Sequence, residues 1–204
     1  MWIKICGMTT PEAVAAALEA RVAAIGFVFT ASPRQVTPAF AAELARPARA
    51  RVECVAVTRH PAPELVAQIL EVFRPDTLQT DFQDLRPLTL PSSLRVLPVV
   101  RAGGALPEPL PVRLLYEGPR SGAGQPCEWP AAQALARGRE LVLAGGLSAG
   151  NVAEAIDSVR PFGIDVSSGV EERPGVKSRT KILQVVEAAR AAFAAPAHAA
   201  VPSS

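Results

Sequence analysis

The chain has 204 residues, of which 49% are hydrophobic and 20% charged, and its formal net charge is +2. This composition excludes wholesale disorder, and the length suits a single domain with a sizeable core. The small net charge gives no reason to expect binding to nucleic acid or to a membrane surface.

Short apolar runs of strand length alternate with longer amphipathic stretches along the chain. The expected strands are Trp2–Cys6, Ala24–Phe29, Val52–Val57, Thr77–Gln79, Val96–Val100, Arg113–Tyr116, Leu141–Ala144 and Gly163–Val166. The expected helices are Pro11–Ala20, Pro38–Ala45, Pro63–Phe73, Ala131–Arg137, Ala149–Val159 and Lys181–Phe193. Thr10 is a suitable N-cap for the first helix, and Ser148 stands before the fifth. Continuous apolar strands between helices are typical of a parallel sheet covered on both faces.

This alternation predicts either a closed (β/α)8 barrel or an open doubly wound sheet. Length favours the open sheet, because a barrel usually takes about 250 residues. Residues 80–94 and 102–112 are poor in helix-forming sequence, so a barrel would have reduced helical layers after strands four and five. Residues 1–193 are expected to form one barrel domain, and 194–204 a disordered tail.

Anion-binding chemistry follows the last two expected strands. The residues concerned are Gly145 and Gly146 after one strand, and Ser167, Ser168 and Gly169 after the next. Glycines let backbone amides approach an anion, and a following helix adds partial positive charge. Two ordinary turns that contain glycine are the alternative interpretation. The order matches the phosphate site that barrels commonly build after strands seven and eight, which favours the closed barrel.

A thiol stands at the end of the first strand. Cys6 would point into the mouth of a barrel, where catalytic groups lie, and Lys4 should share its face of the strand. Such a cysteine acts as a general base if its pKa is brought toward neutrality. The alternative role is a small buried hydrophobic residue.

The segment Lys4-Ile5-Cys6-Gly7-Met8-Thr9 resembles the opening signature of the phosphoribosylanthranilate isomerase family. Residues 26–34, 143–152 and 165–177 resemble later motifs of that family, in the expected order and across nearly the whole chain. The resemblance implies a (β/α)8 TIM barrel in the cytoplasm that serves tryptophan biosynthesis. It also implies a small phosphorylated substrate, with no metal and no cofactor. A monomer and a homodimer both remain open.

The family performs an Amadori rearrangement by general acid–base catalysis. The resemblance implies that Cys6 is the base, that Arg34 contacts the anthranilate end of the substrate, and that Asp165 is an active-site aspartate. Gln79 matches the glutamine of the family's strand-four motif. Lys4, Arg34, Gln79 and Asp165 are therefore the expected substrate-binding residues.

The sequence departs from the family at strand six, where the family has an aspartate as the general acid. Counting back from Gly122-Ala123-Gly124 places Glu117 at that position, whereas counting forward from Leu114-Leu115 places Tyr116 there. Glu117 is preferred, because a carboxyl group transfers a proton in the same way with one more methylene of reach.

Strand four departs as well, because the histidine and glycine that follow the family's Gln-Leu pair are absent from Thr77–Asp81. Neither His60 nor His198 replaces that histidine. Cys54 and Cys127 are expected to be packing residues, and no CxxC pair suggests a zinc site or a disulfide framework. The departures leave two alternatives open: another sugar-phosphate isomerase, and a catalytically weak or dead barrel that binds a phosphorylated ligand.

Overall fold

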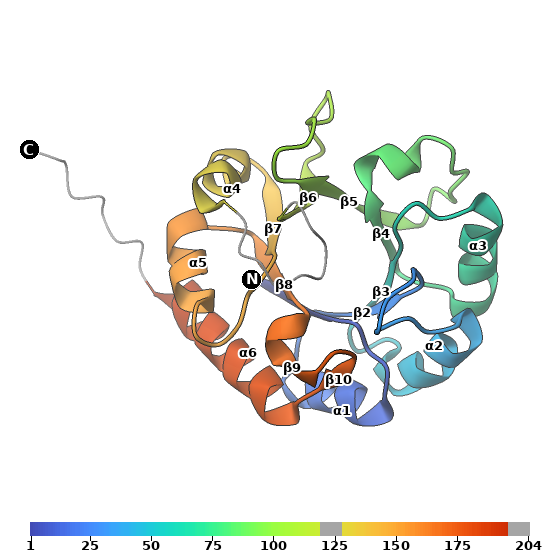
Figure 1. Ribbon diagram of the computed structural model, residues 1–204, viewed down its shortest axis with the longest axis horizontal. Coiled ribbons are helices and arrows are strands. Elements are labelled where there is room, and N and C mark those ends of the chain that lie inside the picture. Colours follow the sequence, from blue (N-terminus) through green and yellow to red (C-terminus); the bar gives the residue numbers. More distant parts are fainter. Residues whose placement is uncertain (119–127, 196–204) are drawn as a thin grey trace, which may run out of the picture.

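The computed structural model describes residues 1–118 and 128–195. Eight parallel strands close into a barrel in chain order, and Figure 1 looks down the ring that they form inside a layer of helices. The strands are β1 (Trp2–Cys6), β2 (Ala24–Val28), β3 (Glu53–Val57), β4 (Thr77–Asp81), β5 (Arg95–Arg101), β6 (Arg113–Glu117), β7 (Glu140–Ala144) and β8 (Gly163–Val166). The expected closed barrel is confirmed.

Within the described residues, six α-helices and four short helical segments accompany the strands. The α-helices are α1 (Pro11–Glu19), α2 (Pro38–Ala45), α3 (Pro63–Gln68), α4 (Trp129–Ala136), α5 (Val152–Val159) and α6 (Arg179–Ala194). The short segments are η1 (Arg46–Ala48), η2 (Ile69–Phe73), η3 (Phe82–Leu85) and η4 (Ser168–Val170). After β8 the chain also forms a small antiparallel pair, β9 (Glu171–Arg173) with β10 (Val176–Lys177), which was not expected from the sequence.

The helical layer is reduced where the sequence predicted it. Only the short η3 follows β4, and the described residues between β5 and β6 contain no helix; Figure 1 shows loops in this sector. The Thr10 cap is confirmed, because its hydroxyl accepts the Ala13 N–H at 3.2 Å. Helix α5 begins at Val152, three residues later than expected. The Asn151 side chain instead holds the preceding segment in a turn.

Alternation along each strand sorts the side chains into two cores. Ile3 and Ile5 belong to the large cluster between barrel and helices, whereas Trp2 belongs to a smaller cluster inside the barrel. Because side chains alternate across a strand, Lys4 and Cys6 share the inner face with Trp2. Cys6 is the last residue of β1, so its thiol lies at the carboxyl-terminal rim of the barrel.

Two expectations concern residues that the structure leaves out. The tail was expected to begin at residue 194, but helix α6 ends at Ala194, and residues 196–204 lie outside the described residues. Cys127 lies outside them as well. Cys54 is a buried free thiol in the outer core, as its packing role requires. Within residues 1–118 and 128–195, no helix has the length and apolar character needed to span a membrane.

Candidate active site

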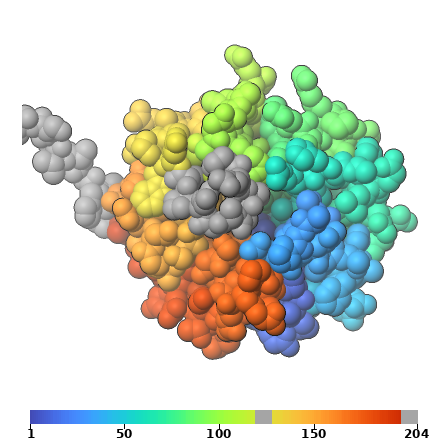
Figure 2. Space-filling view, in the orientation of Figure 1, coloured from blue at the N-terminus to red at the C-terminus, as the bar shows by residue number. Residues whose placement is uncertain are grey.

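A cavity of about 410 Å³ opens at the carboxyl-terminal rim of the barrel. Its wall takes residues from the end of every strand or from the segment that follows it. Figure 2 views this rim and shows a hollow bordered by the blue and teal segments after β2 and β3. The predicted residues on the wall are Cys6, Arg34, Gln79, Glu117, Gly145, Gly146, Asp165, Ser167 and Ser168. Lys4 and Gly169 do not line it.

Lys4 lies beneath the cavity and is completely buried. Its ammonium group donates to the Gln79 amide oxygen at 2.9 Å and to Asp165 Oδ2 at 2.8 Å. Burial alone would lower the Lys4 pKa, but the negative charge of Asp165 and the nearby Cys6 outweigh it and raise the pKa. Lys4 is therefore a fixed cation that orients two residues of the cavity wall.

The Cys6 thiol is 6% exposed and lies beside the same cation. Burial raises the Cys6 pKa above its ordinary value of 9.0, and Asp165 adds to that effect, while Lys4 and Lys177 act in the opposite direction. The resting group is consequently a thiol at neutral pH. Positive charge of the kind that the two lysines place beside Cys6 favours the thiolate form of a cysteine.

The neighbouring sector of the rim, after β7 and β8, has the geometry of an anion site, and β8 pairs directly with β1. Gly145 and Gly146 have φ values of 99° and 63°, in the left-handed region that glycine adopts without strain. Gly169 lies against the β7 segment, since a Cβ there would come within 1.9 Å of the Leu147 carbonyl oxygen. Gly169 thus permits close approach of two loops, and Ser167 and Ser168 then face the cavity beside the glycine pair.

The β9–β10 hairpin ties the β2 sector to the β8 sector through three buried charges. Arg34 donates from Nε and Nη2 to the two Glu171 carboxylate oxygens, at 2.7 and 2.8 Å. Lys177 donates to Glu171 Oε1 at 2.8 Å and to the Ser167 carbonyl oxygen at 3.0 Å. Burial would raise the Glu171 pKa, but the hydrogen bonds from Arg34 and Lys177 prevail and lower it.

This arrangement predicts a pH-dependent loss of stability in the Glu171→Gln variant. A carboxyl group with a depressed pKa stabilises the fold above its unfolded pKa and loses that effect as pH falls through its folded pKa. At pH 7 we expect Glu171→Gln to lower the free energy of unfolding by about 3 kcal/mol, because two buried cations lose their anion. The gap from the wild-type protein should shrink below pH 4.5, the ordinary value for this carboxyl group. Urea unfolding at pH 7 and pH 3 measures both quantities.

The neighbouring exposed Glu172 provides the control, since Glu172→Gln removes one charge without touching the hairpin's buried contacts. This control should unfold like the wild-type protein at both pH values. Equal stability of Glu171→Gln and Glu172→Gln at pH 7 would contradict the structural role of Glu171.

The structure separates the two candidates for the strand-six acid. Glu117 lines the cavity, whereas Tyr116 belongs to the core between barrel and helices. Glu117 Oε2 accepts from Arg101 Nη1 at 3.0 Å, and Arg101 also contacts Asp81 on β4. The glycine-rich segment used in the sequence comparison lies outside the described residues.

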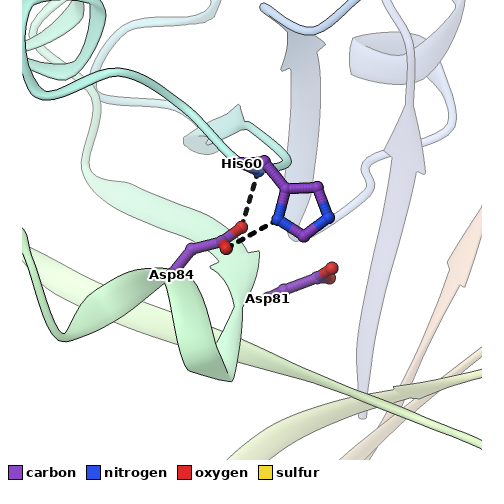
Figure 3. A group of neighbouring side chains, drawn as sticks. All are labelled: His60, Asp81 and Asp84. Atoms are coloured by element: carbon purple, nitrogen blue, oxygen red, sulfur yellow. Dashed lines mark hydrogen bonds and ion pairs between the residues drawn. The ribbon is translucent and has the colours of Figure 1, made fainter.

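Sequence reasoning missed four charged residues at this rim. They are Asp81, Arg101, Glu171 and Lys177, and no role was assigned to any of them from the sequence. A strand-end signal was available for Asp81 and Arg101, because charged residues that directly end a parallel strand gather at one rim of a barrel. Figure 3 shows Asp81 beside His60 and Asp84, where His60 Nδ1 lies 2.8 Å from Asp84 Oδ1 and joins the segments after β3 and β4.

Comparison with known proteins gives a consistent result. Residues 3–188 match the family model described as N-(5'-phosphoribosyl)anthranilate (PRA) isomerase. The chain is 38% identical to the N-(5'-phosphoribosyl)anthranilate isomerase of Bradyrhizobium sp. strain BTAi1, over 93% of this chain and 95% of that protein. The corresponding protein of Bordetella bronchiseptica is also 38% identical, over 91% of this chain and 94% of its own length.

Solved structures agree with the sequence relatives. The phosphoribosyl anthranilate isomerase of Thermus thermophilus superposes with a TM-score of 0.81 and 31% identity, covering 94% of this chain and 99% of that one. A phosphoribosyl anthranilate isomerase in complex with reduced 1-(o-carboxyphenylamino)-1-deoxyribulose 5-phosphate gives a TM-score of 0.78 at 27% identity, with the same coverage. The chain therefore belongs to the N-(5'-phosphoribosyl)anthranilate isomerase family.

Proposed function

We propose that this protein converts N-(5'-phosphoribosyl)anthranilate into 1-(2-carboxyphenylamino)-1-deoxy-D-ribulose 5-phosphate, in the cytoplasm, as a step of tryptophan biosynthesis. One observation carries the proposal: a single cavity has a thiol and a carboxyl group on its wall, together with a glycine- and serine-rich end. Cys6 and Glu117 supply the two proton-transfer groups that the reaction needs. The amides and hydroxyls around Gly146 and Ser168 suit the substrate phosphate.

The substrate would lie across the cavity with its phosphate at the β7 and β8 ends. Arg34 Nη1 makes no hydrogen bond to a described residue, so this edge of the guanidinium is available to the anthranilate carboxylate. Asp165 Oδ1 likewise has no partner among the described residues and would accept a sugar hydroxyl, with Gln79 beside it. Lys4 contributes by holding Gln79 and Asp165.

Proton transfers then complete the isomerisation. Glu117 protonates the furanose ring oxygen, and the C1–O bond breaks to give the open-chain Schiff base. The Cys6 thiolate removes the proton from C2, and the electron pair moves toward the nitrogen to form an enolamine. Cys6 returns its proton to C1 of the enolamine, and the C2 hydroxyl proton passes to the Glu117 carboxylate, which gives the ketone and restores both groups. Atoms and charge balance over the cycle without a metal or a redox cofactor.

Complementation of a tryptophan auxotroph that lacks this one step tests the proposal. We expect the wild-type chain to restore growth and the purified protein to form the ketose product, detected by chromatography against a standard. Expression of folded protein without growth or product would contradict the proposal and would favour a barrel that only binds a phosphorylated ligand.

A further inference from the structure

Three charged side chains at the ends of β4, β5 and β6 form one connected cluster. Arg101 uses every nitrogen of its guanidinium in this cluster. Its Nε and Nη2 donate to Asp81 Oδ2 and Oδ1 at 3.2 and 2.6 Å, and its Nη1 donates to Glu117 Oε2 at 3.0 Å. The bidentate hydrogen bonding of Arg101 to the Asp81 carboxylate fixes the plane of the guanidinium. It therefore also fixes the direction of the N–H group that donates to Glu117.

The strands hold this cluster rigidly. Arg101 and Glu117 are register partners on β5 and β6, and the Ala102 N–H donates to the Glu117 carbonyl oxygen at 2.9 Å. The side chains of Arg101, Asp81 and Glu117 are only 18, 13 and 12% exposed, so solvent screens their charges weakly. The cluster is part of the cavity wall, because Arg101 and Glu117 both line the cavity.

We propose that Arg101 and Asp81 are positioning residues for Glu117. Arg101 directs the Glu117 carboxyl group toward the substrate, and Asp81 offsets the positive charge of Arg101 so that Glu117 can hold a proton. The inference rests on the proposed role of Glu117 as the general acid. An arginine beside a carboxyl group favours the ionised form, which cannot donate a proton. The Asp81 carboxylate on the far side of the guanidinium reduces that effect without moving Arg101.

Asp81 occupies the second position after Gln79, which is where the family has its strand-four histidine. The chain thus replaces a group that is neutral or cationic with an anion, and the anion is bound to Arg101.

Among the described residues, Arg59, His60 and Asp84 also lie close to Asp81. Arg59, after β3, lies 3.8 Å from Asp81 and its side chain is 49% exposed. His60 and Asp84 pair with one another beside Asp81, with the His60 side chain 65% exposed (Figure 3). Cys6, Lys4 and Asp165 belong to β1 and β8.

The pH dependence of kcat in three variants tests the proposal. The limb that belongs to Glu117 is identified first, as the limb that Glu117→Gln lacks. Asp81→Asn leaves the full charge of Arg101 beside Glu117, so this limb should move to lower pH by about half to one unit. Arg101→Met removes the cation and leaves Asp81, so the limb should move to higher pH by a similar amount.

Arg101→Lys keeps the positive charge but loses the two-nitrogen contact with Asp81. This variant therefore separates the orientation of Glu117 from the electrostatic effect on it. We expect its limb to stay near the wild-type position while kcat falls about tenfold or more and KM changes by less than about threefold. Arg95→Met is the matched control, because Arg95 begins the same strand at the opposite rim and its side chain is 59% exposed. This control should show wild-type kcat and an unmoved limb.

Thermal melting and binding of inorganic phosphate verify that each variant is folded. If Arg101→Met does not fold, the lowered limb of Asp81→Asn and the reduced kcat with an unmoved limb of Arg101→Lys still decide the matter. This inference would be overturned if Glu117→Gln is inactive while every Asp81 and Arg101 variant keeps the wild-type kcat and the wild-type position of the limb. The proposed function would then remain intact. Full activity of Glu117→Gln would instead reject Glu117 as the acid, and this inference with it.

Discussion

The Cys6→Ala variant is expected to lose at least about a hundredfold in turnover, because it has no group to take the proton from C2 of the sugar. The substitution removes one sulfur atom from a residue that is 6% exposed, so Lys4 loses one polar neighbour but keeps its hydrogen bonds to Gln79 and Asp165. Binding of the reduced product analogue should therefore stay within about threefold of wild type. Steady-state kinetics and calorimetric titration measure the two quantities.

Cys54→Ala is the matched control for this prediction. Cys54 is also a buried free cysteine, but its side chain packs in the outer core, where burial raises its pKa to about 11. Its loss should alter stability and leave turnover close to wild type. A Cys6→Ala enzyme with near-normal turnover would remove the thiol from the mechanism.

The pH dependence of the wild-type enzyme follows from the same residue. Burial raises the Cys6 pKa, so the thiolate fraction is small at neutral pH and grows as pH rises. The limb of the rate profile that depends on thiolate formation should accordingly be absent from Cys6→Ala.

The Glu117→Gln variant is expected to lose about a hundredfold or more in turnover, because glutamine keeps the shape of the side chain but has no proton to give to the ring oxygen. The Arg101 contact should persist, since the glutamine carbonyl oxygen accepts the same hydrogen bond. KM is expected to change little. Tyr116→Phe is the control, since Tyr116 lies in the outer core and its replacement should leave turnover within about threefold.

A slow Tyr116→Phe with a normal Glu117→Gln would reverse the assignment of the acid. Single-turnover measurements strengthen the distinction, because they report ring opening and proton abstraction without product release.

The barrel could be predicted from sequence because its strands are buried on both faces and read as continuous apolar runs. β1 and β8 have the boundaries expected for them, and α2 does as well. The predicted helix boundaries were wrong where side chains compete with the hydrogen bonds of the helix backbone. Asn151 accepts the Ser148 N–H and donates to the Gly146 carbonyl oxygen, which delays α5 by a turn.

The site could be predicted only in part, for a physical reason. Cys6, Gly146 and Ser168 belong to local motifs whose chemistry is visible one strand end at a time. The Arg101–Asp81 pair depends on the register between β4 and β5, and the Arg34–Glu171 pair joins residues 137 positions apart. Propensity and periodicity carry no information on such pairings. The β9–β10 hairpin was missed for a related reason, because Glu171–Lys177 reads as a polar turn.

The hairpin after β8 has a consequence for how the protein is made. Strand β1 pairs with β8, and Glu171 binds Arg34, so the first and last parts of the chain meet along one seam. Until the ribosome has released residues 163–177, β1 presents an unpaired edge, and the cavity lacks the part of its wall that β8 and the hairpin provide. A nascent chain is thus vulnerable to edge-to-edge association until β8 and the hairpin have emerged.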